Sequence, residues 1–199
     1  CALPIFSRIW IYPIKSLDPV GLESVSITAG GSLENDRRWG LVDESGAWIN
    51  GKREPKIHRI RTKFIAVEGR IEQVTLEVSG FGAETFGLDQ GCDRLKLEAW
   101  LSAYFQQPVF LRENAAMGFP DDRQASGPTI VSQSSLETVS HWFEGLSLDN
   151  IRRRFRANLE LADVPPFWED QLFGQKGGHR PFTLGAVEFL GIKIGRAHV

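Results

Sequence analysis

Short segments rich in β-branched and aromatic residues, separated by turns that contain glycine or proline, fill the first half of this chain. These residue types favour strands, and many short strands with frequent turns favour a barrel or a sandwich over a wound α/β sheet. Two of the turns, at residues 43–46 and 68–70, are expected to join neighbouring strands as hairpins. The expected strands are residues 5–12, 23–27, 38–42, 47–49, 64–67 and 74–78.

Helices are expected later in the chain, and they are few. Large apolar residues recur at helical spacing between Leu97 and Phe105, and Pro108 marks the end of that helix. Residues 112–127 lack a clear periodicity and are interpreted as a long loop between two halves. Loops of this length are often functional.

A second helix is expected to follow a short strand at residues 129–132. Ser134 and Glu137 lie three positions apart, which is the pattern of a capping box. Residues 155–161 are expected to return to strand, and residues 182–192 to form a hairpin. The apolar face of the second helix would consist of Leu136, Val139, Trp142 and Phe143.

Composition limits the classes of partner. The 199 residues allow one large domain or two small ones, and 23 Lys+Arg against 25 Asp+Glu give a formal net charge of -2. This balance argues against a nucleic-acid or membrane partner, so a bound anion would need a local basic cluster. No apolar run approaches the length of a membrane span, and Cys1 and Cys92 make neither a disulfide framework nor a zinc cluster. We therefore expect a cytoplasmic protein.

Three polar groups stand where predicted strands end. In residues 12–16 (YPIKS), a lysine and a hydroxyl beside a proline suit an anion such as phosphate, although a solvated lysine is the alternative. In residues 36–39 (DRRW), an arginine suits phosphate or a planar heterocycle, and a surface Asp-Arg pair is the alternative. Along a strand at residues 152–158 (RRRFRAN), Arg156 and Asn158 would share one face with Arg154; a solvated basic edge is the alternative.

No residue is nominated as catalytic or as a metal ligand. His58 and His141 have no partner His or Cys at ligand spacing, and no Ser-His-Asp set can be assigned. Nothing in the sequence supports pyridoxal phosphate as a cofactor.

Together these segments resemble bacterial-type proteins of the MOSC family, which is named after the C-terminal domain of molybdenum cofactor sulfurase. In these proteins the MOSC domain is preceded by an N-terminal β-barrel domain. The order and spacing of the matching segments cover nearly the whole chain. The segments are residues 12–16 (YPIKS), 36–42 (DRRWGLV), 54–55 (EP), 129–136 (TIVSQSSL, similar to LVSEASL), 154–158 (RFRAN, similar to RFRPN) and 167–170 (FWED).

The resemblance implies a mainly β, α+β fold with a few short helices, in which two β-barrel domains occupy residues 1–111 and 112–199. It implies a molybdenum cofactor of the molybdopterin type. Because the relatives include amidoxime-reducing enzymes, it also implies an oxidoreductase that acts on a small N-oxygenated substrate with a redox partner protein or domain. Carried over by position, the cofactor-binding residues would be Lys15, Ser16, Arg37, Ser126, Arg156 and Asn158.

Two departures from the family pattern stand out. Ala157 replaces a proline, which should alter rigidity more than chemistry. After residues 187–191 the family has a Cys-x-x-Cys-type segment whose cysteine binds molybdenum, whereas this chain reads IKIGRAHV. Residues 194–199 resemble one reading frame of a sequencing-adapter oligonucleotide. We expect the natural protein to continue past Gly191 with that cysteine, the second domain here to be incomplete, and this chain alone to be inactive.

Two other classes of function stay open. One is a non-catalytic carrier of the molybdenum cofactor or of sulfur, which would bind the pterin without turnover. The other is a β-barrel binding module that uses the basic residues 152–156 for another anion, and salt-dependent binding to oligonucleotides would favour it. The complete protein is an enzyme if the oxidoreductase hypothesis is right, and it is not an oxidoreductase if it is a carrier or a binding module.

Overall fold

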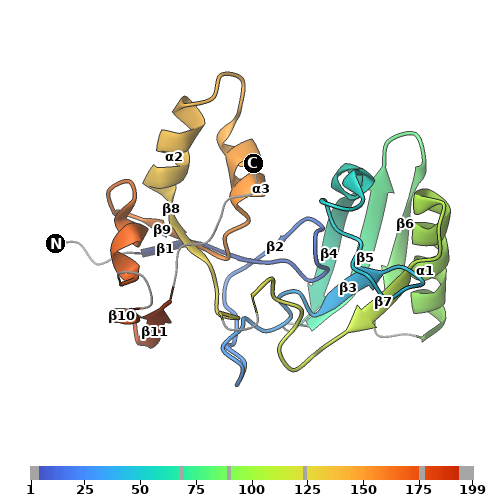
Figure 1. Cartoon of the computed structure of the whole chain (residues 1–199), viewed down its shortest axis with the longest axis horizontal. Coiled ribbons are helices and arrows are strands. Elements are labelled where there is room, and N and C mark those ends of the chain that lie inside the picture. Colours follow the sequence, from blue (N-terminus) through green and yellow to red (C-terminus); the bar gives the residue numbers. More distant parts are fainter. Residues whose placement is uncertain (1–4, 68–69, 89–90, 123–124, 175–177, 193–199) are drawn as a thin grey trace. The chain divides into compact units, whose positions relative to one another are not determined.

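The computed structural model describes residues 5–67, 70–88, 91–122, 125–174 and 178–192, and the chain forms two compact units (Figure 1). Unit 1 comprises residues 1–10 and 128–199, and unit 2 comprises residues 11–127. The first strand therefore belongs with the last third of the chain. The boundary expected after residue 111 separates two domains that are defined by family resemblance. The two compact units are defined by contacts within the chain, so they do not test that boundary, which stays a prediction.

Unit 2 contains two antiparallel groups of strands. β4, β5 and β6 follow one another as a meander, and β3 pairs with β7. Val74, Leu76 and Val78 of β5 are buried while the residues between them are more exposed, as expected for a strand with one face toward a core. The elements are β2 (Val20–Leu22), β3 (Trp39–Val42), η1 (Pro55–Arg59), β4 (Arg61–Val67), β5 (Arg70–Val78), β6 (Gly82–Gly87), α1 (Gly91–Phe105) and β7 (Phe110–Glu113).

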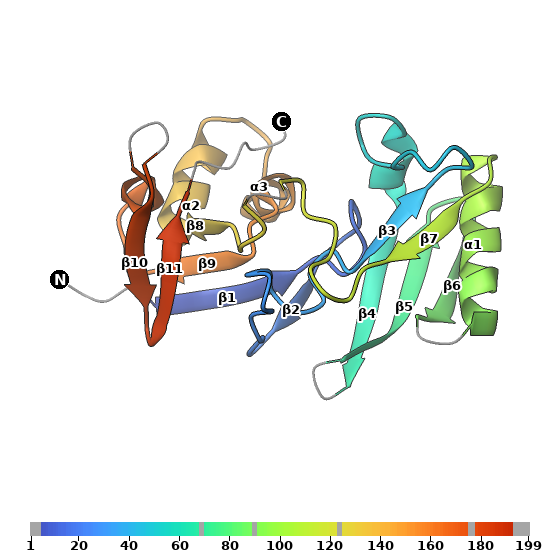
Figure 2. The same cartoon turned by 60° about the horizontal axis from the view of Figure 1, so that its bottom comes forward.

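The helix α1 lies beside β6 and β7 and contacts both (Figure 2). Its buried residues Leu97, Leu101 and Phe105 recur every four positions, so they form one apolar stripe. Arg94 and Glu98 on the same helix bind backbone groups of Leu111 in β7, which fixes the helix against that strand.

Unit 1 is built around β9, which pairs antiparallel with β1 and parallel with β8. Two helices contribute Leu136, Val139 and Ile151 to a cluster with Val131 of β8. A hairpin of two strands contributes Leu184 to a second cluster, which also contains Leu161 and Val164. The elements are β1 (Ile5–Ile11), β8 (Ile130–Ser132), α2 (Gln133–His141), α3 (Leu148–Phe155), β9 (Leu159–Ala162), η2 (Trp168–Leu172), β10 (Arg180–Leu184) and β11 (Val187–Gly191).

The structure is of the α+β class, as predicted, and several elements are confirmed. They are the first strand, the pairing of β4 with β5, the helix that ends before Pro108, the strand β8 and the hairpin of β10 and β11. The turn at residues 43–46 is also confirmed, with Asp43 N–H donating to Ala47 O at 3.0 Å. Barrel closure stays a prediction. Within the described ranges, no helix combines the length and the apolar character needed to cross a membrane.

The expected strand at residues 155–161 is wrong at its start, because α3 continues to Phe155 and β9 begins only at Leu159. Ser147 caps α3 by accepting the Asn150 N–H, and Ile151 is its buried residue. Arg152 to Arg154 therefore lie on a helix, and the alternation of Arg154, Arg156 and Asn158 along a strand is wrong.

Three further expectations need correction. The predicted strand at residues 23–27 is replaced by the shorter β2, from Val20 to Leu22. The N-cap of α2 is Ser132, which accepts the Ser135 N–H, rather than a box starting at Ser134. The helix ends at His141, so the expected apolar face is shorter, and Trp142 and Phe143 are exposed.

The stripe on α1 can be tested with a matched pair of substitutions. Leu101 is completely buried, so Leu101→Ala should lower the free energy of unfolding by about 2–5 kcal/mol through lost burial and a cavity. Leu95 on the same helix is 66% exposed, and Leu95→Ala should change it by less than about 0.5 kcal/mol. Denaturant unfolding of the three proteins measures both values, and equal effects would contradict the packing of α1.

Candidate functional site

Two of the polar motifs that the sequence singled out lie side by side in unit 2. Residues 12–15 run alongside residues 37–39, and Ile14 and Trp39 form a parallel bridge. Arg37 N–H donates to Tyr12 O at 2.8 Å, Trp39 N–H donates to Pro13 O at 3.0 Å, and Lys15 N–H donates to Trp39 O at 2.8 Å. The backbone itself therefore brings Lys15 and Arg37 to one place.

A third segment, from the long loop, packs onto this pair. Phe119 N–H donates to Arg37 O at 2.8 Å, and Lys15 Nζ donates to Phe119 O at 3.0 Å. Gly118 permits this approach, because a Cβ there would lie 2.4 Å from Asp36 O and its φ is +65°. The loop at residues 112–127 thus contributes directly to the candidate site.

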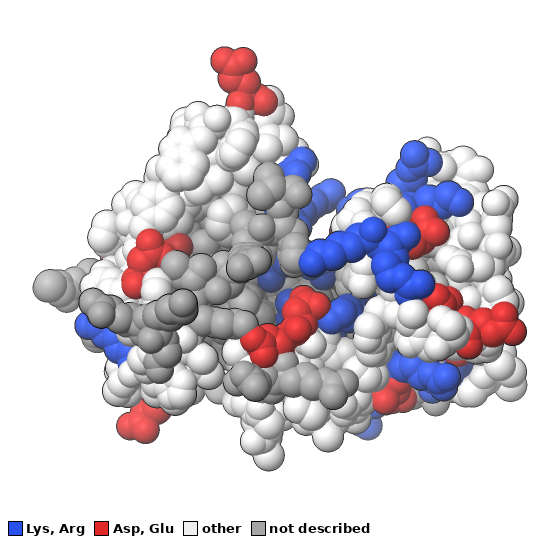
Figure 3. Space-filling view, in the orientation of Figure 1, with Lys and Arg blue, Asp and Glu red and all other residues white. Residues whose placement is uncertain are grey.

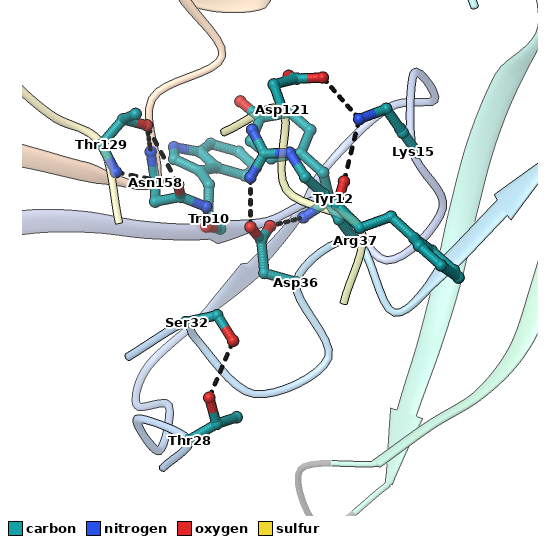
Figure 4. A network of polar contacts seen from close by, with 11 residues as sticks. Trp10, Tyr12, Lys15, Thr28, Ser32, Asp36, Arg37, Asp121, Thr129 and Asn158 are labelled. Atoms are coloured by element: carbon teal, nitrogen blue, oxygen red, sulfur yellow. Dashed lines mark hydrogen bonds and ion pairs between the residues drawn. The ribbon is translucent and has the colours of Figure 1, made fainter. Parts of the chain in front are cut away.

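Asp36 fixes the position of the Arg37 side chain (Figure 4). Its Oδ1 accepts the Tyr12 N–H at 2.8 Å, and its Oδ2 accepts the Arg37 guanidinium. The guanidinium carbon lies 5.5 Å from the centre of the Tyr12 ring, within the range of a cation–π contact. The Asp36 side chain is only 7% exposed, so this arrangement is held inside the protein.

Lys15 lies in an environment of negative and π-electron groups. Its Nζ is 2.6 Å from Asp121 Oδ1 and 6.0 Å from the centre of the Trp48 ring, in addition to the Phe119 carbonyl. Trp48 packs against the Phe119 ring with centroids 4.8 Å apart. The Lys15 side chain is 14% exposed, so the ammonium is held at the protein surface with little freedom.

Three of the six predicted site residues have a left-handed backbone. The φ angles are 72° at Ser16, 50° at Arg37 and 53° at Arg156. Residues other than glycine rarely adopt this conformation, which costs of the order of 1–3 kcal/mol. At Arg156 the left-handed backbone is the C-cap of α3, whereas at Ser16 and Arg37 no helix ends, and strain of this kind occurs at functional sites.

Ser126, also in unit 2, donates its hydroxyl to Gly30 O at 2.6 Å. The neighbouring turn is closed by a 2.9 Å hydrogen bond between the Thr28 and Ser32 hydroxyls. The described contacts of Ser126 therefore attach the loop to this turn, and its role toward a cofactor stays a prediction.

Asn158 and Arg156 belong to unit 1. Asn158 is buried, and its Oδ1 accepts the Thr129 N–H and hydroxyl, each at 3.1 Å, while its Nδ2 donates to Trp10 O at 3.1 Å. These contacts join the ends of the strands (Figure 4). Arg156 caps α3, its N–H donating to Arg152 O at 2.9 Å. Contact of either residue with a cofactor stays a prediction.

The basic run before Arg156 is partly used within the fold. Arg152 binds Glu160 of β9 through two contacts, of 2.9 and 2.8 Å, and the Glu160 side chain is 3% exposed. This hydrogen bonding raises the pKa of Arg152. Arg153 and Arg154 remain exposed on α3. The run is therefore a weaker anion site than its sequence indicates.

The sequence did not single out Asp36, Phe119 or Asp121 as site residues. For Asp36 the sequence leaves a surface pair with Arg37 as one of two alternatives, and Asp121 belongs to a pair of adjacent carboxylates, which suits acid–base catalysis poorly. The only sequence signal for Phe119 and Asp121 is their place in a long loop with Gly118. Among the described residues, no group of three or more His, Cys, Asp or Glu side chains is arranged to hold a metal.

Comparison with known proteins identifies a family and distant relatives. The family described as "MOSC N-terminal beta barrel domain" matches residues 4–108, which are 105 of the 199 residues. The chain is similar to Mitochondrial amidoxime-reducing component 1 of Xenopus laevis (26% identity, covering 85% of this chain and 60% of the relative). It is also similar to Molybdenum cofactor sulfurase of Danio rerio (23% identity, 94% of this chain and 28% of the relative). This chain thus spans less than two thirds of the length of either relative.

A solved structure of a Bordetella bronchiseptica protein matches with 15% identity, covering 50% of this chain and 95% of that chain, at a TM-score of 0.34. A TM-score of that size does not show a shared fold.

The role of Asp36 can be tested by removing its carboxylate. Asp36→Ala removes the carboxylate that accepts the buried Tyr12 N–H and that pairs with Arg37, so the free energy of unfolding should fall by about 1–3 kcal/mol. Glu44 is exposed in the turn at residues 43–46, and Glu44→Ala should change it by less than about 0.5 kcal/mol. Chemical denaturation gives both values, and a neutral Asp36→Ala would show that the carboxylate is dispensable.

Proposed function

This chain belongs to the MOSC N-terminal β-barrel domain family, and on that premise we propose that it binds a molybdenum cofactor through the anionic end of its pterin. The observation that supports the proposal most is the backbone ladder that sets Lys15 beside Arg37. The relatives named above are, by their names, an amidoxime-reducing component and a molybdenum cofactor sulfurase.

The side chains of the cluster fit a phosphate-bearing ligand. A lysine ammonium supplies a point charge, and an arginine guanidinium supplies a planar pair of donors that matches phosphate oxygens. Ser16 follows Lys15 directly and adds a hydroxyl from a strained, left-handed backbone. In the proposal, these three residues bind and orient the cofactor, with Asp36 holding the guanidinium in place.

The remaining predicted residues enter the proposal with different roles. Ser126 and Arg156 are proposed contacts of the cofactor, and Asn158 is proposed to position the backbone around Arg156 because its amide holds Thr129 and Trp10. When bound, a molybdenum cofactor supplies oxygen or electron transfer. The thiolate expected to bind the metal is not assigned to a described residue, and Cys92 is an exposed residue in the first turn of α1.

For the whole protein, we propose an oxidoreductase that acts on a small N-oxygenated substrate with a redox partner. This part rests on the similarity to the amidoxime-reducing component, of which the chain covers 60%. A carrier that handles the cofactor without turnover is the second candidate, and the similarity to the sulfurase, which covers 94% of this chain, favours it.

Cofactor binding can be tested by expressing the chain in cells that make molybdopterin and measuring the bound pterin as its fluorescent oxidation product. Lys15→Met and Arg37→Met should each lower the pterin content at least about tenfold, because one charge-assisted contact is lost. Lys63→Met and Arg70→Met remove the same charges from exposed positions on β4 and β5, and they should retain the pterin. Equal pterin content in all variants would refute the proposed site.

Turnover distinguishes the two candidates. The complete protein, loaded with cofactor, is mixed with an amidoxime and a chemically reduced dye as electron donor, and the amidine product is measured. An oxidoreductase should form amidine in proportion to its molybdenum content, whereas a carrier should retain the pterin and form none. The Lys15→Met variant, which lacks the cofactor, provides the background rate.

A further inference from the structure

The candidate site contains two ion pairs, and in each of them one positive charge is balanced by one negative charge. Lys15 and Arg37 contribute two positive charges, and Asp36 and Asp121 contribute two negative charges within direct contact. Acidic side chains also lie among the basic ones on the face of unit 2 seen in Figure 3. A neutral cluster attracts an anion weakly, so a site for phosphate would gain from losing one of its carboxylates.

The two carboxylates differ in how easily they can leave. Asp36 is 7% exposed and accepts both the Tyr12 N–H and the Arg37 guanidinium, so its withdrawal would break two contacts inside the protein. Asp121 is 69% exposed and follows Pro120 in the loop, with its Oδ1 at 2.6 Å from Lys15 Nζ. Water screens an ion pair whose carboxylate is exposed, so Asp121 can leave its lysine more readily than Asp36 can leave its arginine.

We infer that Asp121 is a built-in counter-ion that occupies the anion position on Lys15 and must leave it before a phosphate-type ligand binds. This inference rests on the proposed function, because it assigns a specificity role within the same site. Phe119 O holds Lys15 Nζ at 3.0 Å from the backbone, so the ammonium keeps its place when the carboxylate leaves. The cluster then carries a net charge of one positive unit, from two basic groups and Asp36.

The internal competitor has a consequence for selectivity. A weakly held anion cannot displace a carboxylate that is tethered beside the lysine, whereas a ligand with several charged oxygens and a second contact at Arg37 can. The carboxylate would thus keep single small anions from occupying the site.

The test measures pyrophosphate affinity by isothermal titration calorimetry. Asp121→Asn should bind pyrophosphate about threefold to tenfold more tightly than the unaltered chain. Glu44→Gln removes one negative charge from an exposed position of the same unit, and its affinity should stay within about twofold. In the Lys15→Met background, Asp121→Asn should have a much smaller effect, because the proposed competition is for the Lys15 ammonium. Circular dichroism of each variant verifies that it is folded.

The possible outcomes separate this inference from the proposed function. If Asp121→Asn leaves the affinity unchanged while Lys15→Met weakens it, the counter-ion role is overturned and the anion site stands. If Asp121→Asn tightens binding equally with and without Lys15, Asp121 acts only as a distant charge and the inference is also overturned. If no variant binds pyrophosphate, both the inference and the anion site fail.

Discussion

The parallel backbone contact between residues 12–15 and 37–39 is the constraint on which the candidate site depends. Its three hydrogen bonds use main-chain groups only, so they align Lys15 and Arg37 whatever their side chains do. Side-chain contacts then act on groups that are already placed, with Asp36 orienting the guanidinium and Phe119 receiving the ammonium. A site built this way is supported by the fold rather than by a flexible surface.

Elements with a local signal were predictable from the sequence. Helix α1 shows its stripe of apolar residues within fifteen positions, and the pairing of β4 with β5 follows from two apolar runs joined by a short connection. The helix α3 was not expected at all, because three consecutive arginines hide an apolar spacing that runs from Leu148 through Ile151. Arg153 and Arg154 lie on the solvent face of this helix, and the sequence alone does not distinguish that face from a strand edge.

The site was predictable as a list of residues but not as an arrangement. Lys15 and Arg37 were found from their chemistry and from the family resemblance. The contact between Lys15 and Asp121 joins residues 106 positions apart, and no periodicity or motif connects positions so distant. Asn158 has a structural role that its motif does not indicate, because its buried amide holds Thr129 and Trp10, and its contact with a cofactor stays a prediction.

At Ser16, Arg37 and Arg156 the left-handed backbone favours glycine for folding, whereas the proposed binding role requires the side chains that are present. Glycine adopts this conformation without the penalty of a Cβ, so the chain would fold more readily with glycine at all three positions. A library of variants selected for thermal resistance alone should therefore accumulate glycine there and lose the hydroxyl and the two guanidinium groups. Selection for ligand retention should preserve the original residues. The residues found at these three positions would thus show whether a population of variants was selected for stability or for binding.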